Sequence, residues 1–108
     1  MGEKFWVQDF GTLIDRLRIH FISEKRQVKS IIVVQYEAYI DGQWRPIVRF
    51  DEAHGFFHRD LLSPDGGQEK TARPGDKSFA LNEAIAEIKQ NWQTYRKAYE
   101  ARYYDQDR

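Results

Sequence analysis

The residues best suited to chemistry lie in one stretch of the chain, residues 49–60. The stretch contains two of the three histidines, with carboxylates and arginines on either side of a glycine-containing turn. Histidine titrates near neutral pH, so an imidazole beside a carboxylate is the usual acid/base unit, and arginine can stabilise phosphate charge. The candidate catalytic residues are therefore Arg49, Asp51, His54, His58, Arg59 and Asp60.

Imidazole and carboxylate groups also suit divalent metal ions, so Asp51, His54, His58 and Asp60 have to be weighed as a metal site. His54 and His58 are four residues apart, but Gly55 and a strand-like context deny them the shared face of a helical pair. We therefore expect no metal site and no cofactor. The structural alternative is that His58, Arg59 and Asp60 form cross-strand pairs near the end of a hairpin.

A run of basic residues in the N-terminal half is the second candidate site. Arg16, Arg18 and His20 alternate with apolar residues, so one strand would present them together on its solvent face, where they would suit phosphates. Tyr39, expected on the same side of the sheet, could stack on a base. An ordinary solvated strand face would explain the same pattern. If the run binds RNA or DNA, the residues involved are Arg16, Arg18, His20, Lys25, Arg26 and Lys29.

The elements that position these residues indicate an α+β fold. Apolar and polar residues alternate over residues 13–21, which is typical of a strand, whereas apolar residues recur at spacings of four and three over residues 81–99, which is typical of a helix. We predict an antiparallel sheet of four to five strands followed by one long C-terminal amphipathic helix packed on one face, in a single domain of residues 1–108. The expected strands are about 13–22, 28–40, 43–51 and 56–62, with 68–72 as the fifth, and the helix is about 77–103.

Asp41-Gly42 marks the turn of the central hairpin, and the charges near it suggest its register. A two-residue loop would place Arg49 opposite Val34, on the apolar face of the hairpin. A three-residue loop over residues 40–42 pairs Val34 with Val48 and leaves the apolar stripe unbroken. We therefore predict the three-residue loop, with Gly42 in the left-handed conformation.

Large aromatic residues line the second half of the C-terminal helix. A helix over residues 77–103 would be roughly 40 Å long, whereas a six-residue strand spans only about 20 Å. The second half should therefore extend past the sheet and pack either on N-terminal aromatic residues such as Phe10 or on a second copy of the chain. In a homodimer the interface would contain Trp92, Tyr95, Tyr99 and Tyr103.

Length and composition narrow the class of protein. The 108 residues fit one domain, and lysine plus arginine equals aspartate plus glutamate at 17 each, which argues against strong, purely electrostatic binding to nucleic acid or membrane. The chain has no cysteine, no apolar run long enough to span a membrane, and no glycine-rich phosphate loop, GxSxG or HExxH motif. We expect a cytoplasmic protein that does not associate with membranes.

Three segments carry a resemblance to known proteins: residues 42–51, 54–60 and 64–66. They resemble a bacterial domain family of unknown function and, more loosely, the TumE-like toxin components of toxin–antitoxin pairs. Those proteins share about this length, an aromatic–aspartate strand end, a histidine-bearing segment and a C-terminal helix. The matching residues here are Phe50, Asp51 and His58. The resemblance implies a small bacterial cytoplasmic protein that pairs with a helix-turn-helix antitoxin.

Two functions follow from these observations. The first is a non-catalytic interaction module that forms a homodimer and binds a partner, either RNA or DNA or a protein such as a cognate antitoxin. The second is a metal-independent RNase-like toxin that uses His54 and His58 as acid and base. The neutral net charge and the lack of a known catalytic spacing favour the first function, so we do not expect an enzyme.

Overall fold

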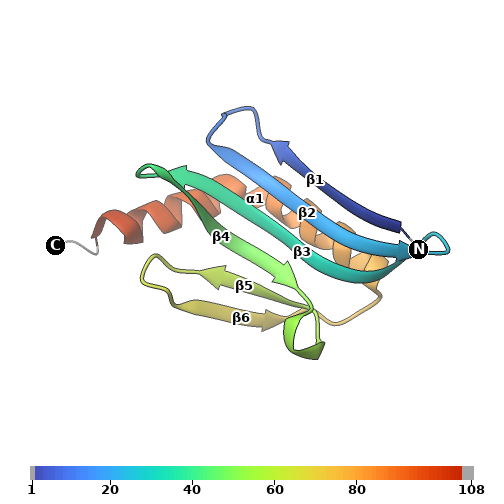
Figure 1. Cartoon of the computed structure of the whole chain (residues 1–108). Helices are drawn as coiled ribbons and strands as arrows, with labels where there is room; N and C mark the ends of the chain where they lie inside the picture. Colours follow the sequence, from blue (N-terminus) through green and yellow to red (C-terminus); the bar gives the residue numbers. More distant parts are fainter. Residues whose placement is uncertain (1, 106–108) are drawn as a thin grey trace.

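A six-stranded antiparallel sheet with one long helix across it makes up the computed structural model, which describes residues 2–105 (Figure 1). The strands lie side by side in the order of the sequence, so every strand pairs with its neighbour in the chain. The α+β prediction is confirmed, but four to five strands was too few. The elements are β1 (Gly2–Asp9), β2 (Asp15–Glu24), β3 (Gln27–Ile40), β4 (Gln43–Asp51), the 3-10 helix η1 (Ala53–Gly55), β5 (His58–Leu62), β6 (Gln68–Ala72) and α1 (Lys77–Asp105).

The strand that sequence reasoning missed is β1, which pairs with β2 along its whole length, from Gly2 opposite Ser23 to Asp9 opposite Arg16. It lies at the edge of the sheet, and neither of its faces is fully covered. Alternation of apolar and polar residues arises where one face of a strand is buried. An edge strand that is open on both faces carries no such pattern, so residues 5–7 are simply three apolar residues in a row.

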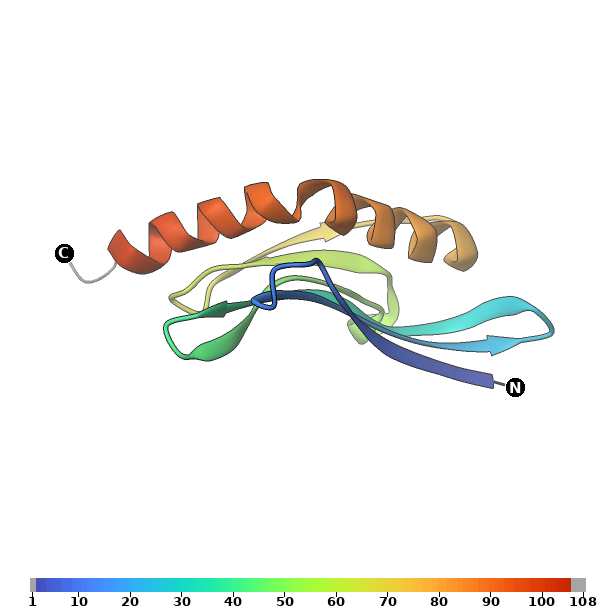
Figure 2. The ribbon, with the colours of Figure 1, turned by 90° about the horizontal axis from the view of Figure 1, so that it is seen from above.

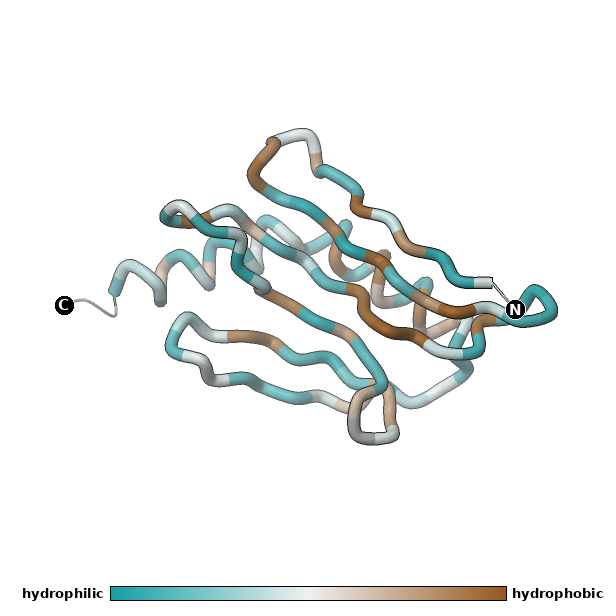
Figure 3. Tube along the Cα trace, viewed as in Figure 1, coloured by the Kyte–Doolittle hydropathy of each residue, from teal (hydrophilic) through white to brown (hydrophobic). Residues whose placement is uncertain are grey.

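The helix α1 covers one face of the sheet and leaves the other uncovered, as the turned view makes plain (Figure 2). Apolar residues concentrate in β2, β3 and β4, whereas β6 is polar (Figure 3). Alternate residues of these central strands point toward the helix and form the core with it. The core includes Leu17, Ile19, Val34, Tyr36, Val48, Phe50, Ala84 and Ile88, each between 0% and 2% exposed. We call the uncovered side the open face.

The observed register of the central hairpin differs from the predicted one. Its loop has two residues, Asp41 and Gly42, because Ile40 pairs with Gln43, and both loop residues are left-handed, with φ of 52° and 79°. The three-residue loop is therefore wrong, although the left-handed Gly42 is confirmed. A register shift after Tyr36 then brings Val48 opposite Tyr36 and leaves Arg49 opposite Gln35, away from the core. A β-bulge, not a longer loop, keeps the charge off the apolar face.

The helix α1 begins with a side-chain cap and runs beside the longest strand. A carboxylate oxygen of Asp76 accepts a hydrogen bond from the Phe79 N–H at 3.1 Å, as expected for a helix N-terminus. The 29 residues of α1 span about 43 Å, and the 14 residues of β3 span about 46 Å. The prediction assumed strands of about six residues; β3 is much longer, so most of the second half of α1 lies over the sheet, and only its C-terminal end projects past the β3–β4 turn (Figures 1 and 2). No helix in the described range is long and apolar enough to cross a membrane.

A buried ion pair fastens the helix to the sheet near the middle of the C-terminal half. Arg96 of α1 donates to Asp15 of β2 at 2.7 Å, and Asp15, which is 1% exposed, also accepts from the Tyr36 hydroxyl. Burial and then the Asp15 carboxylate raise the pKa of Tyr36, so its hydroxyl stays a donor at neutral pH. Phe10 stacks on Trp92 at 5.0 Å between ring centroids. The second half of α1 therefore packs on an N-terminal aromatic residue, which was one of the two predicted alternatives.

Candidate functional site

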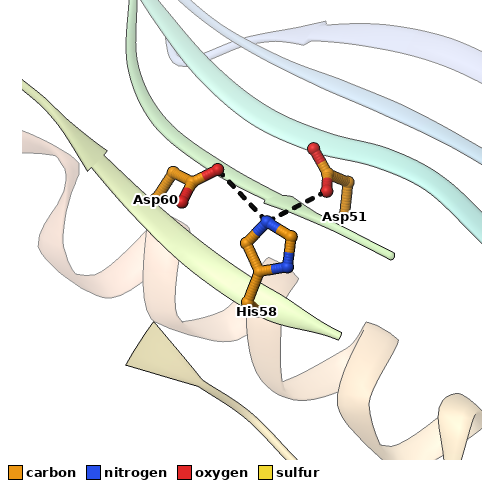
Figure 4. Close-up of side chains that lie close together, drawn as sticks. All are labelled: Asp51, His58 and Asp60. Atoms are coloured by element: carbon orange, nitrogen blue, oxygen red, sulfur yellow. Dashed lines mark hydrogen bonds and ion pairs between the residues drawn. The ribbon is translucent and has the colours of Figure 1, made fainter. Parts of the chain in front are cut away.

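The pairing of β4, β5 and β6 gathers four ionisable side chains on the open face. Asp51 lies opposite His58, and Lys70 lies opposite Asp60, two residues further along β5. The Nε2 atom of His58 is 3.2 Å from a carboxylate oxygen of Asp51 and 3.2 Å from one of Asp60 (Figure 4). The Lys70 ammonium lies 3.0 Å from the same nitrogen. We call Asp51, His58, Asp60 and Lys70 the histidine cluster.

The other ring nitrogen of His58 fixes the orientation of the imidazole. Nδ1 lies 3.0 Å from the carbonyl oxygen of Phe56, which can only accept, so Nδ1 carries a proton and donates. The ring is fully buried at 0% exposed, and the Phe56 ring lies against it at 5.1 Å. Asp60 is 6% exposed, so two members of the histidine cluster are buried on a face that no helix covers.

The remaining predicted catalytic residues do not join the histidine cluster. Arg59 points to the covered face, where it contacts Glu87 and Tyr95 of α1 at 3.3 Å. Arg49 is exposed on the open face and donates to Gln35. His54 lies in η1, and its side chain is outside the part of the chain that the structure describes. The strand β5 starts at His58 instead of residue 56, because η1 and the residues after it leave the ladder.

Arg16, Arg18 and His20 do share the open face, but a buried carboxylate pairs with the two arginines. Arg16 and Arg18 lie on the open face and form ion pairs with Glu37 at 2.6 and 3.3 Å. Gln35 also donates to Glu37 and accepts from Arg49, so hydrogen bonds cross β2, β3 and β4. We call Arg16, Arg18, Gln35, Glu37 and Arg49 the arginine network.

The protonation of Glu37 follows from these contacts. Its burial raises the pKa of the carboxyl, but the hydrogen bonds from Arg16, Arg18 and Gln35 outweigh burial and lower that pKa below its ordinary value. Glu37 is therefore a carboxylate at neutral pH and holds both arginines against the sheet. The two arginines are thus less available to phosphates than their spacing in the sequence suggests.

The other members of the basic run are distributed over the far end of the hairpin β2–β3. His20 lies 2.5 Å from a carboxylate oxygen of Glu3, and Lys29 forms an ion pair with Glu24 at 3.0 Å. Lys25 and Arg26 form the turn itself, both with positive φ and both exposed. On the open face, Tyr39 lies edge-on to Trp44, and the Arg16 guanidinium sits 3.9 Å from the Trp44 ring centre. The predicted stacking side of the sheet therefore contains these aromatic rings.

The four aromatic residues of the predicted interface make contacts within the chain. Trp92 stacks on Phe10, and Tyr95 donates to Glu87. Tyr99 is buried at 7% exposed and stacks on Tyr103, whose ring also lies 4.6 Å from the Arg45 guanidinium. The structure thus removes the reason for which these residues were assigned to a dimer, which was a lack of anything to pack on.

Sequence reasoning overlooked three residues, Gln35, Glu37 and Lys70. Gln35 and Glu37 are polar residues at alternate positions of a strand whose middle is mostly apolar, and this pattern was a detectable signal. Lys70 joins the histidine cluster only through the pairing of β5 with β6. No local pattern connects it to His58, which lies 12 positions earlier in the chain.

Comparison with known families matches residues 1–104 to the model of a domain of unknown function, DUF7718. The chain belongs to this family. The match spans nearly the whole chain and agrees with the predicted membership of an uncharacterised domain family; it carries no statement about bacteria or toxins, so the TumE-like resemblance stays a prediction. Neither the curated proteins nor the solved structures contain a significant match to this DUF7718 chain.

Proposed function

We propose that the chain is a non-catalytic interaction module that forms a homodimer through the free edge of β1. The observation that carries the proposal is an eight-residue edge strand that exposes three large apolar side chains in succession: Phe5 at 54%, Trp6 at 41% and Val7 at 46%. An edge strand presents unpaired backbone N–H and C=O groups, and natural proteins normally protect such edges with charge, proline or bulges. Residues 5–7 of β1 have none of these.

The sequence of β1 favours a second copy of itself as the partner. Two antiparallel copies related by a two-fold axis place one residue opposite itself, so the choice of that residue sets the register. Centring on Trp6 would put Glu3 opposite Asp9 of the second copy, which brings like charges together. Centring on Phe5 pairs the Phe5 rings and places Lys4 opposite Trp6, where a cation–π contact is favourable. We therefore assign the register centred on Phe5.

The alternative of an RNase-like toxin receives less support from the geometry. A catalytic acid or base must reach a proton on its substrate. His58 is 0% exposed, its Nδ1 donates to the Phe56 carbonyl, and its Nε2 lies among Asp51, Asp60 and Lys70. In this arrangement no nitrogen of His58 faces solvent, which favours a non-catalytic role.

Cysteine cross-linking tests the proposed dimer directly, because the natural chain has no cysteine. A Phe5→Cys variant would bring two thiols into the range at which antiparallel neighbours can form a disulfide. We expect oxidation to convert most of that variant to a covalent dimer on a gel. A Phe79→Cys variant is the matched control, since Phe79 is a similarly exposed aromatic at 63% but lies on α1. We expect it to stay largely monomeric on the same gel.

Analytical sedimentation provides a second test of the homodimer. We expect the wild-type chain to sediment as a dimer at micromolar concentration and Phe5→Lys to sediment as a monomer, because that variant places two lysines opposite each other, while Phe79→Lys remains a dimer. A wild-type monomer would reject the homodimer and leave strand addition by a different protein as the use of this edge. Dissociation by Phe79→Lys but not by Phe5→Lys would move the interface to the helix.

A further inference from the structure

The histidine cluster has the dimensions of a metal site. Two donor atoms that each lie about 2.1 Å from one ion are about 3.0 Å apart at a right angle and about 3.4 Å apart at the tetrahedral angle. In this chain His58 Nε2 lies 3.2 Å from Asp51 Oδ1 and 3.2 Å from Asp60 Oδ2. Within the described residues, these three side chains are the one group of at least three His, Cys, Asp or Glu whose donor atoms all lie within 4.8 Å of one another.

The orientation of the imidazole matches that of a metal-ligating histidine. Such a histidine usually donates its second ring N–H to a backbone carbonyl or carboxylate, which fixes the tautomer and points the other lone pair at the ion. His58 Nδ1 does this toward the Phe56 carbonyl. Nε2 then faces the two carboxylate oxygens of Asp51 and Asp60, as Figure 4 shows.

Two carboxylates that face the same point repel each other unless a cation lies between them. In the described structure Lys70 supplies a positive charge, 3.0 Å from Nε2 and 3.1 Å from the second oxygen of Asp60. That oxygen is buried and makes no hydrogen bond of good geometry, so the ammonium pairs with it by charge alone. Lys70 is 32% exposed, so its long side chain can swing into solvent without disturbing the core.

We propose that Asp51, His58 and Asp60 bind one divalent transition-metal ion, with Zn²⁺ the best match to one imidazole and two carboxylates. The sequence offered Asp51, His58 and Asp60 as ligands together with His54, and the expectation of no metal rested on the spacing of the two histidines. The set proposed here uses carboxylates that only the β4–β5 pairing brings to His58. Binding would tie the end of β4 to the start of β5 and displace the Lys70 ammonium. The proposal does not depend on the homodimer.

Titration of Zn²⁺ into the full chain, purified without a histidine tag and freed of metal by a chelator, tests the site. We expect one ion per chain by calorimetry and a rise in melting temperature on addition of Zn²⁺. His58→Gln and Asp51→Asn should weaken binding by about 10–100-fold, since losing a direct ligand costs at least as much as losing an outer-shell partner. His20→Gln is the matched control, because His20 also lies on the open face beside a carboxylate, and it should bind like the wild type.

A substitution that should strengthen Zn²⁺ binding distinguishes a metal site from a simple ionic cluster. Lys70→Met removes the competing ammonium, so it should lower stability without metal and bind Zn²⁺ several-fold more tightly than the wild type. This variant also covers the case in which His58→Gln fails to fold. The proposal is overturned if the wild type binds no Zn²⁺, if His20→Gln loses binding as much as His58→Gln, or if Lys70→Met binds more weakly.

Discussion

The two faces of the sheet bury polar groups in different ways. On the covered face, α1 excludes water from an apolar core and leaves one deeply buried ion pair, Asp15 with Arg96. On the open face no helix or strand among residues 2–105 covers the sheet, yet Glu37, His58 and Asp60 are 8% exposed or less. Their cover consists of neighbouring side chains on the same face, such as the arginines around Glu37 and the Phe56 ring beside His58.

This difference teaches that an uncovered sheet face need not be a plain solvated surface. Charged groups that lose contact with water need partners, because an unpaired buried charge is costly. The arginine network and the histidine cluster supply these partners across strands, so the open face depends on pairing and the covered face on packing. Three substitutions test this contrast, from the largest expected effect to the smallest.

Removing a core ring should have the largest effect. Phe50 is 1% exposed between the sheet and the helix, so Phe50→Ala should lower the free energy of unfolding by about 3–5 kcal/mol. Ile32, at 43% exposed on the neighbouring strand, is the control, and Ile32→Ala should cost below about 1 kcal/mol. Chemical denaturation measures both values. Equal losses at the two positions would contradict the assignment of the core to the covered face.

Breaking the buried ion pair should have the next largest effect. Arg96→Met leaves the Asp15 carboxylate buried without its guanidinium partner, which should lower the free energy of unfolding by about 3 kcal/mol. Adding Asp15→Asn should recover part of that loss, because the unpaired charge is then gone. A double-mutant cycle by denaturation gives the coupling. Simple additivity of the two losses would show that the pair is not coupled.

The smallest of the three effects lies on the open face and depends on pH. Glu37→Gln should cost about 1–2 kcal/mol at neutral pH, because hydrogen bonds to the charged carboxylate are lost. Arg16 and Arg18 hold the folded-state pKa of Glu37 below its ordinary value of 4.5, despite burial, which acts to raise it. This contribution is therefore present above pH 4.5 and lost as the pH falls through the folded-state pKa.

Stability measured from pH 7 down to pH 3 checks the sign. The wild type should lose more stability over this range than Glu37→Gln, which has no carboxyl to titrate at that position. Glu87 on the covered face gives the comparison, since burial raises its pKa but hydrogen bonds from Tyr95 and Arg73 lower it overall. Glu87→Gln should likewise lose less stability between pH 7 and pH 3 than the wild type does. Parallel curves for the wild type and Glu37→Gln would contradict a depressed pKa at this residue.

Sequence patterns predicted the elements whose cause is local. The spacing of apolar residues predicted α1, β2, β3 and β4 close to their observed bounds, because burial of one face imposes the period. Gly42 was predicted to be left-handed, and it is. The bulge after Tyr36 was not predicted, since it depends on how two strands align over several residues beyond the turn. The edge strand β1 was missed because neither of its faces is fully covered.

In the candidate site, too, the sequence predicted what depends on nearby residues and missed what depends on strand pairing. Asp51, His58 and Asp60 were named from their chemistry, and the short β4–β5 connection keeps them close in the fold. Their partner Lys70 comes from a later strand, and Arg59, although adjacent to His58, points to the opposite face. Adjacent residues of a strand point to opposite faces, so closeness along the chain was a poor guide to the members of the site.

The sequence by itself determined the fold class, the long C-terminal helix, the left-handed Gly42 and the stretch in which ionisable residues concentrate. These depend on periodicity and turn chemistry, which act over a few residues. Tertiary structure decided which charges are paired, that Glu37 and His58 are buried on an uncovered face, and that the tyrosines of α1 find partners within the chain. These depend on strand order and register, which are set by contacts between residues far apart in the sequence.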